Sequence, residues 1–158
     1  IHHGRRQLLH VGVTAHPTAA WVIQQLREAF PFESAPGYLI LDRDSKFSEA
    51  VHGAIRSMGT TPVTTAYRSP WQNGVAERWV GSCRRELLDR VVVFNDCHLR
   101  RLLAEHGRYD AEDRTHLTLG KDPPDHRSVE SKPSSGAKVV GRPRVGGLHH
   151  RYPWRDAA

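Results

Sequence analysis

The 158-residue sequence lacks the usual features of a secreted or membrane-bound protein. It has two cysteines, Cys83 and Cys97, and no CxxC pair, which argues against a disulfide framework and against a cysteine zinc site. No apolar run approaches the roughly 18 residues of a membrane-spanning helix, and no signal-peptide pattern opens the chain. We therefore expect a protein of the cytoplasm with no membrane partner.

Acidic residues are outnumbered by basic ones, and the excess is uneven along the chain. The net charge is +6; residues 1–120 hold 15 Lys and Arg against 13 Asp and Glu, and residues 121–158 hold 8 against 4. The second stretch also contains five of the ten prolines. We expect one domain over residues 1–120 and a basic, proline-rich tail over residues 121–158, with one late strand within 142–152. Such a tail suits the phosphates of a nucleic acid, and a solvated linker explains it equally well.

The remaining patterns alternate between strands and helices. Apolar runs predict strands at 7–14, 38–41 and 61–66. Apolar residues at helical spacing predict helices that start at His16-Pro17, follow Ser48 as N-cap, cover 73–89, and cover 96–109. This order is typical of an α/β domain.

Two acidic residues follow consecutive predicted strands. Asp42 ends the strand at 38–41, and Glu77 lies in the first turn of the helix after a Ser-Pro and Gln-Asn-Gly turn cluster. Two carboxylates from separate segments are suitable ligands for Mg²⁺ or Mn²⁺, and paired metals of this kind promote phosphodiester chemistry. The structural alternative is that Asp42 caps a loop and Glu77 favours the positive end of a helix. On spacing alone, the structural alternative is the simpler one.

The helix at 73–89 has two distinct faces. One carries Glu77, Gly81, Arg84 and Leu88, which places a cation beneath the carboxylate. About a quarter-turn away lies an apolar stripe of Ala76, Trp79, Val80, Cys83 and Leu87. The first face suits a phosphate backbone, or is a solvated basic surface.

Two blocks resemble a known family. YLILDRDSKF (38–47) and TTAYRSPWQNGVAERWVGSCRREL (64–87) are similar to the integrase catalytic core of DDE-type bacterial insertion-sequence transposases and retroviral integrases. Asp42 matches the second catalytic aspartate, and Glu77 matches the glutamate of the Asn-Gly-x-x-Glu-Arg pattern. RTHLTL (114–119) resembles the Arg-x-His-x-x-Leu signature that closes such cores.

The resemblance implies an RNase H-like fold, in which helices flank a mixed sheet. It implies DNA integration by metal-dependent hydrolysis and strand transfer, with Asp42 and Glu77 as catalytic ligands of two Mg²⁺ or Mn²⁺ ions. It further implies a homo-oligomer that binds transposon ends and target DNA at the bacterial nucleoid. The expected DNA contacts are Arg68, Gln72, Asn73, Arg78, Arg84 and Arg85.

The chain differs from this family in the number of candidate catalytic carboxylates. The family uses a first aspartate on an earlier strand, whereas the only acids before Asp42 are Glu28 and Glu33, near the end of the first helix. We therefore expect a core truncated at its N-terminus, without its first strand and inactive alone. The alternative is a DNA-binding remnant of a transposase without catalysis. The 11 histidines raise a third reading, a His-based metal protein, but none forms an H-E-x-x-H spacing.

Overall fold

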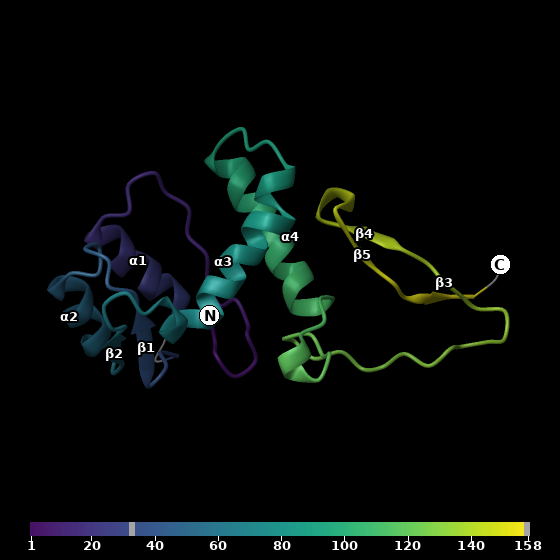
Figure 1. Cartoon of the computed structure of the whole chain (residues 1–158), viewed down its shortest axis with the longest axis horizontal. Coiled ribbons are helices and arrows are strands. Elements are labelled where there is room, and N and C mark those ends of the chain that lie inside the picture. The colour runs from purple at the N-terminus through teal and green to yellow at the C-terminus, as the bar shows by residue number, and fades with distance from the viewer. Residues whose placement is uncertain (32–33, 157–158) are drawn as a thin grey trace. The chain divides into compact units, whose positions relative to one another are not determined.

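The computed structural model describes residues 1–31 and 34–156. Contacts group the chain into two compact units, one of residue 1 with 9–81 and one of residues 2–8 with 82–158. The first contains α1 (Ala19–Ala29), β1 (Tyr38–Leu41), α2 (Glu49–Ser57), β2 (Thr61–Thr64) and the start of α3 (Gly74–Glu86) (Figure 1). The second contains the end of α3, α4 (Asp96–Glu112) and β3 to β6. No helix in the described residues is long and apolar enough to cross a membrane.

The first unit is built on two parallel strands. β1 pairs with β2 in a register that joins Tyr38 to Thr61 and Leu41 to Thr64, and α2 connects the two strands. The core beside them consists of Val22, Leu41, Val51 and Ile55, contributed by α1, β1 and α2. The strands expected at 38–41 and 61–66 are confirmed, apart from the last two residues of the second. Asp42 therefore directly follows a strand whose end is buried.

The strand expected at residues 7–14 is absent: these residues form no ladder. A β-strand needs a neighbour that accepts its backbone hydrogen bonds, and among the described residues the parallel ladder of the first unit joins β1 and β2 alone. Part of the segment lies against α1 instead. His10 Nε2 is 2.9 Å from Gln25 Oε1, and Gly12 sits close to the Trp21 ring. The segment therefore contacts α1 through His10 and Gly12, while Leu9 is 48% exposed.

Helix α1 begins at Ala19, later than the expected start at His16-Pro17. The Thr18 side chain caps it by accepting a 3.2 Å hydrogen bond from the Trp21 backbone N–H. Near the other end, Glu28 accepts hydrogen bonds from the side chains of Gln24 and Gln25 at 3.0 and 3.1 Å. Glu28 is thus engaged on its own helix, and Glu33 lies outside the described residues.

The close approach at Gly12 gives a first prediction. A Cβ at this position would lie 2.4 Å from Gln25 Oε1 and 2.7 Å from the Trp21 ring, so Gly12→Ala should cost about 1–3 kcal/mol of unfolding free energy. The matched control is Gly53→Ala on α2, where a Cβ meets nothing within 4 Å, and it should stabilise by about 0.5–1 kcal/mol. Urea unfolding checks both, and equal effects would show that residues 9–14 do not pack on α1.

The second unit contains the longer helix pair and the tail. Cys83 on α3 and Leu87, just after its end, are buried, as the apolar stripe predicted, but Val80 of that stripe is 57% exposed. Ser82, beside Cys83, is buried instead.

The tail forms two antiparallel pairs, β4 (Arg142–Arg144) with β5 (His149–Arg151) and β3 (Lys138–Val139) with β6 (Trp154–Arg155). Both strands of the first pair fall within residues 142–152.

Candidate functional site

A hydrogen bond joins the end of β1 to the start of α3. The Asn73 Nδ2 amide donates to Asp42 Oδ1 at 2.9 Å, across 31 positions of sequence. Asn73 is buried at the end of a 3-10 turn, Pro70–Asn73, which runs directly into α3 at Gly74. The turn cluster thus fixes where the helix begins relative to the strand.

Glu77 lies one helical turn beyond Asn73. Asn73 ends the 3-10 turn and Glu77 stands in the first turn of α3, so the bond from Asn73 to Asp42 brings the end of β1 to the start of the helix that carries Glu77. Glu77 is exposed and Asp42 is half-buried. The two predicted catalytic residues therefore belong to the same unit, and Asn73, four positions before Glu77, bonds Asp42.

The two carboxylates suit a hard divalent cation. Carboxylate oxygens are the ligands that Mg²⁺ prefers, and Mg²⁺ is often bound by only one or two carboxylates together with water and substrate phosphates. Asn73 holds one oxygen of Asp42 and orients the carboxylate. Among the described residues, no three His, Cys, Asp or Glu side chains are placed to hold a metal ion.

Asp44, two residues after Asp42, makes local hydrogen bonds instead. It accepts hydrogen bonds from the Lys46 backbone N–H at 3.0 Å and from the Lys46 ammonium at 2.7 Å. These contacts hold the pKa of Asp44 below its ordinary value of 3.8, with the backbone bond as the larger cause. Asp44 caps a turn, and this engagement with Lys46 separates its role from that of Asp42.

A side chain of the loop before α3 hydrogen-bonds to the backbone at the start of the same loop. Gln72 Oε1 accepts a 2.7 Å hydrogen bond from the Ala66 backbone N–H, so this predicted DNA contact has a local backbone partner. Arg68 adopts a positive φ of 54°, with its guanidinium carbon 5.1 Å from the Tyr67 ring centroid. Tyr67 and Trp71 are 71% and 73% exposed, and sequence reasoning singled out neither of them. Their exposure depends on the loop conformation, which residue spacing does not reveal.

The arginines of α3 fall in both units. Arg78, just after Glu77, is exposed in the first unit. In the second, Arg84 is 79% exposed at its side chain and lies 3.9 Å from Asp89, and Arg85 is exposed with its carbonyl bonded to Arg90 Nε. All three are accessible to a phosphate. The structure leaves their roles as predictions.

Arg114 of the closing signature is a structural residue. It binds Glu86 at 2.7 Å and Asp110 at 3.4 Å, which ties α3 to the end of α4. Asp110 is buried, and this burial raises its pKa although His116 and Arg114 act in the other direction.

Burial also raises the pKa of the Cys83 thiol to about 12, so Cys83 is not a nucleophile at neutral pH.

Comparisons with known proteins agree with the fold. Residues 58–124 match the family described as integrase core domain, a range that includes Glu77 but begins after Asp42. A chain of the cryo-EM structure of the simian T-cell lymphotropic virus intasome, in complex with PP2A regulatory subunit B56 gamma, is similar with a TM-score of 0.50 and 20% identity. The match covers 90% of this chain and 54% of that chain, so this chain spans about half of its length. No curated protein matches.

Proposed function

We propose, from the integrase-like core that residues 58–124 indicate, that this chain takes part in DNA integration as part of an insertion-sequence transposase. The observation that carries the assignment of residues is the Asn73 to Asp42 hydrogen bond, because it brings the end of β1 to the first turn of α3. Asp42 and Glu77 are then the catalytic carboxylates. The substrates are transposon ends and target DNA, bound by a homo-oligomer at the bacterial nucleoid.

Each residue near the carboxylates has a separate task in this proposal. Asp42 and Glu77 would hold Mg²⁺ or Mn²⁺, which when bound would supply Lewis-acid activation of a water or 3′-hydroxyl and neutralise charge on the phosphodiester. Asn73 keeps the Asp42 carboxylate in a fixed orientation. Arg78 is exposed beside Glu77 and binds the phosphate backbone. Gln72 closes the loop through Ala66 and so shapes the surface that meets DNA.

We further propose that the chain alone does not catalyse strand transfer. Two carboxylates serve the site, and the described residues supply no group of three that could hold a metal. A pair of cations sharing two side chains is weakly bound without phosphate ligands. The same observation favours the second candidate function, a DNA-binding remnant without catalysis, whose affinity would come from the arginines and the basic tail.

Strand joining in the presence of Mn²⁺ distinguishes these functions. We expect no joined product from the chain as given, and product from a chain lengthened at its N-terminus by a strand that carries an aspartate. In the lengthened chain Glu77→Gln should abolish the product, whereas Glu49→Gln, an exposed carboxylate paired with Arg56, should leave it. Product from the chain as given would contradict its inactivity. Absence of product from both, with salt-sensitive DNA binding retained, would favour the remnant.

A further inference from the structure

A hollow of about 630 Å³ lies in the second unit, between residues 120–130 and the end of the tail. Its walls combine aromatic and charged side chains, among them Lys121, Arg127, Glu130, Arg151, Tyr152 and Trp154. This volume falls within the range of small-ligand sites, roughly 300–1,000 Å³. No residue of the proposed catalytic site lines it.

The aromatic wall is held in place. The Trp154 indole Nε1 donates a 3.2 Å hydrogen bond to the Glu130 carbonyl, and β6 pairs Trp154 with Val139 of β3. The Lys132 ammonium lies 5.7 Å from the Trp154 ring centroid. Tyr152 is 68% exposed, so its ring is open to a ligand. An anchored indole and an exposed phenol ring that line the same hollow are suited to stacking on a base.

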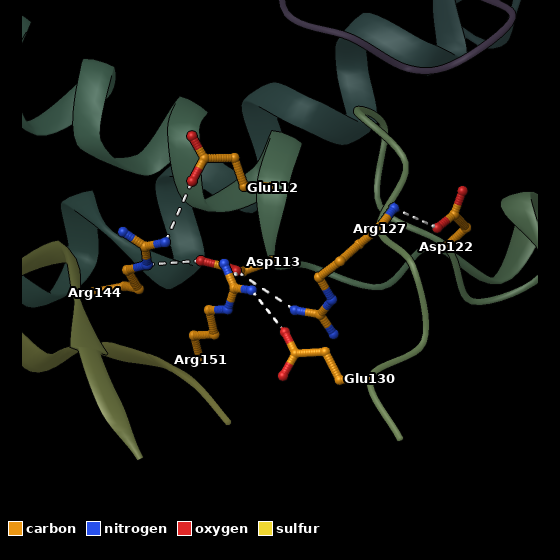
Figure 2. A network of polar contacts seen from close by, with 7 residues as sticks. All are labelled: Glu112, Asp113, Asp122, Arg127, Glu130, Arg144 and Arg151. Carbon is orange, nitrogen blue, oxygen red and sulfur yellow. Dashed lines mark hydrogen bonds and ion pairs between the residues drawn. The ribbon is translucent and has the colours of Figure 1, made fainter. Parts of the chain in front are cut away.

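Some of the basic side chains at the hollow form ion pairs with acidic residues, and others do not. Arg127 and Arg151 reach Asp113 at 3.5 and 3.6 Å, and Arg151 also binds Glu130 at 3.0 Å (Figure 2). These arginines shape the hollow. Lys121 is exposed and makes no ion pair with any described residue, so its ammonium is available to an anion. Lys132 does not line the hollow, but its ammonium lies beside the Trp154 ring and supplies a second cation near it.

We propose that this hollow binds an unpaired base of a DNA strand, stacked on Trp154 and Tyr152, with Lys121 and Lys132 against the adjoining phosphates. The choice of DNA as the ligand rests on the proposed function. Every base presents a π-face, so such a site accepts any sequence and requires only that the base be unpaired. The excess of cations over residues 121–158, 8 against 4, supplies the attraction for the strand.

An abasic strand separates stacking from charge. The chain is titrated with fluorescent oligothymidylate and with an abasic oligonucleotide of the same length and phosphate number, at fixed salt. We expect tighter binding of oligothymidylate. Trp154→Ala should weaken it roughly 5- to 100-fold and leave the abasic strand unchanged. Lys121→Ala should weaken both strands and lower the salt slope by about one.

Two further variants keep the proposal testable. Tyr152→Ala changes an exposed ring, and should reduce the preference for oligothymidylate even if Trp154→Ala disturbs the pairing of β3 with β6. Phe94→Ala removes an aromatic ring that is 80% exposed outside the hollow, and should change neither affinity. Equal binding of the two strands by the unaltered chain, or equal losses for both in Tyr152→Ala, would overturn the proposal. Base preference together with no strand joining by the lengthened chain would reject the proposed function alone, and joining by the lengthened chain without base preference would reject the hollow alone.

Discussion

Asp113→Asn is expected to lower the free energy of unfolding of the second unit by about 3 kcal/mol, the lower end of the range for breaking a buried ion pair. The Asp113 side chain is 1% exposed, and its Oδ2 accepts from Arg144 Nε at 2.7 Å (Figure 2). Arg127 and Arg151 approach its Oδ1. Removing the charge leaves three arginines without their common partner. Because these arginines are 29–37% exposed, water offsets part of the loss.

The neighbouring acid provides the matched control. Glu112 lies 3.3 Å from Arg144 but is 45% exposed, so Glu112→Gln should cost less than about 1 kcal/mol. Urea unfolding followed by circular dichroism measures both variants, and amide exchange on β4 and β5 reports whether the hairpin detaches from the end of α4. Similar losses for the two variants would show that burial of Asp113 does not hold the tail.

Acidification below pH 6.5 is expected to destabilise the second unit through His106. This side chain is fully buried on α4, and neither ring nitrogen has a hydrogen-bond partner among the described residues. Burial lowers the pKa of His106 below its ordinary value of 6.5, and His149 and Arg114 lower it further, against the opposing effect of Asp110 and Glu86. The unfolded chain therefore binds the proton first.

The sign of the pH dependence follows from this shift. The neutral ring stabilises the folded state above pH 6.5, and stability falls as the pH drops from 6.5 towards the lower pKa of the folded state. Asp110 acts oppositely, because burial raises its pKa above 3.8 and the folded chain then binds this proton first. His106→Leu should remove the loss and, by replacing unpartnered nitrogens, stabilise by about 1–3 kcal/mol at pH 7.

Unfolding curves at pH 7.5 and 5.5 measure this dependence. Leu87→Met, a volume-conserving change at another fully buried position, should keep the pH dependence of the unaltered chain. If His106→Leu keeps it too, the titration belongs to another group, and the burial of His106 does not set the acid stability of this unit.

Local signals explain what the sequence predicted well. The run at 38–41 is short and apolar and is followed by Asp42, and α2 starts directly after Ser48, the expected N-cap position, although the Ser48 side chain makes no capping hydrogen bond. These features depend on neighbouring residues alone, so spacing and residue type are sufficient. The resemblance to integrases predicted the integrase-like core, because each of the two blocks that resemble the family is a continuous stretch of sequence.

Long-range contacts account for what the sequence did not predict. Residues 7–14 have strand composition, but composition does not supply a pairing partner, and part of the segment packs on α1. Asn73 was expected to contact DNA, which stays a prediction; its bond to Asp42 spans 31 positions and has no local pattern. The three arginines around Asp113 likewise lie up to 38 positions from it in the sequence. Nothing in their spacing marks them as a group.

Mn²⁺ titration followed by electron paramagnetic resonance tests the assignment of Asp42 and Glu77 to one cation site most directly. In the presence of end DNA, which supplies phosphate ligands, we predict that Asp42→Asn and Glu77→Gln each abolish the bound signal. Asn73→Ala should weaken Mn²⁺ binding about 10- to 100-fold through the freed Asp42 carboxylate. Glu49→Gln should bind as the unaltered chain does. Undiminished Mn²⁺ binding by either Asp42→Asn or Glu77→Gln would contradict the shared site.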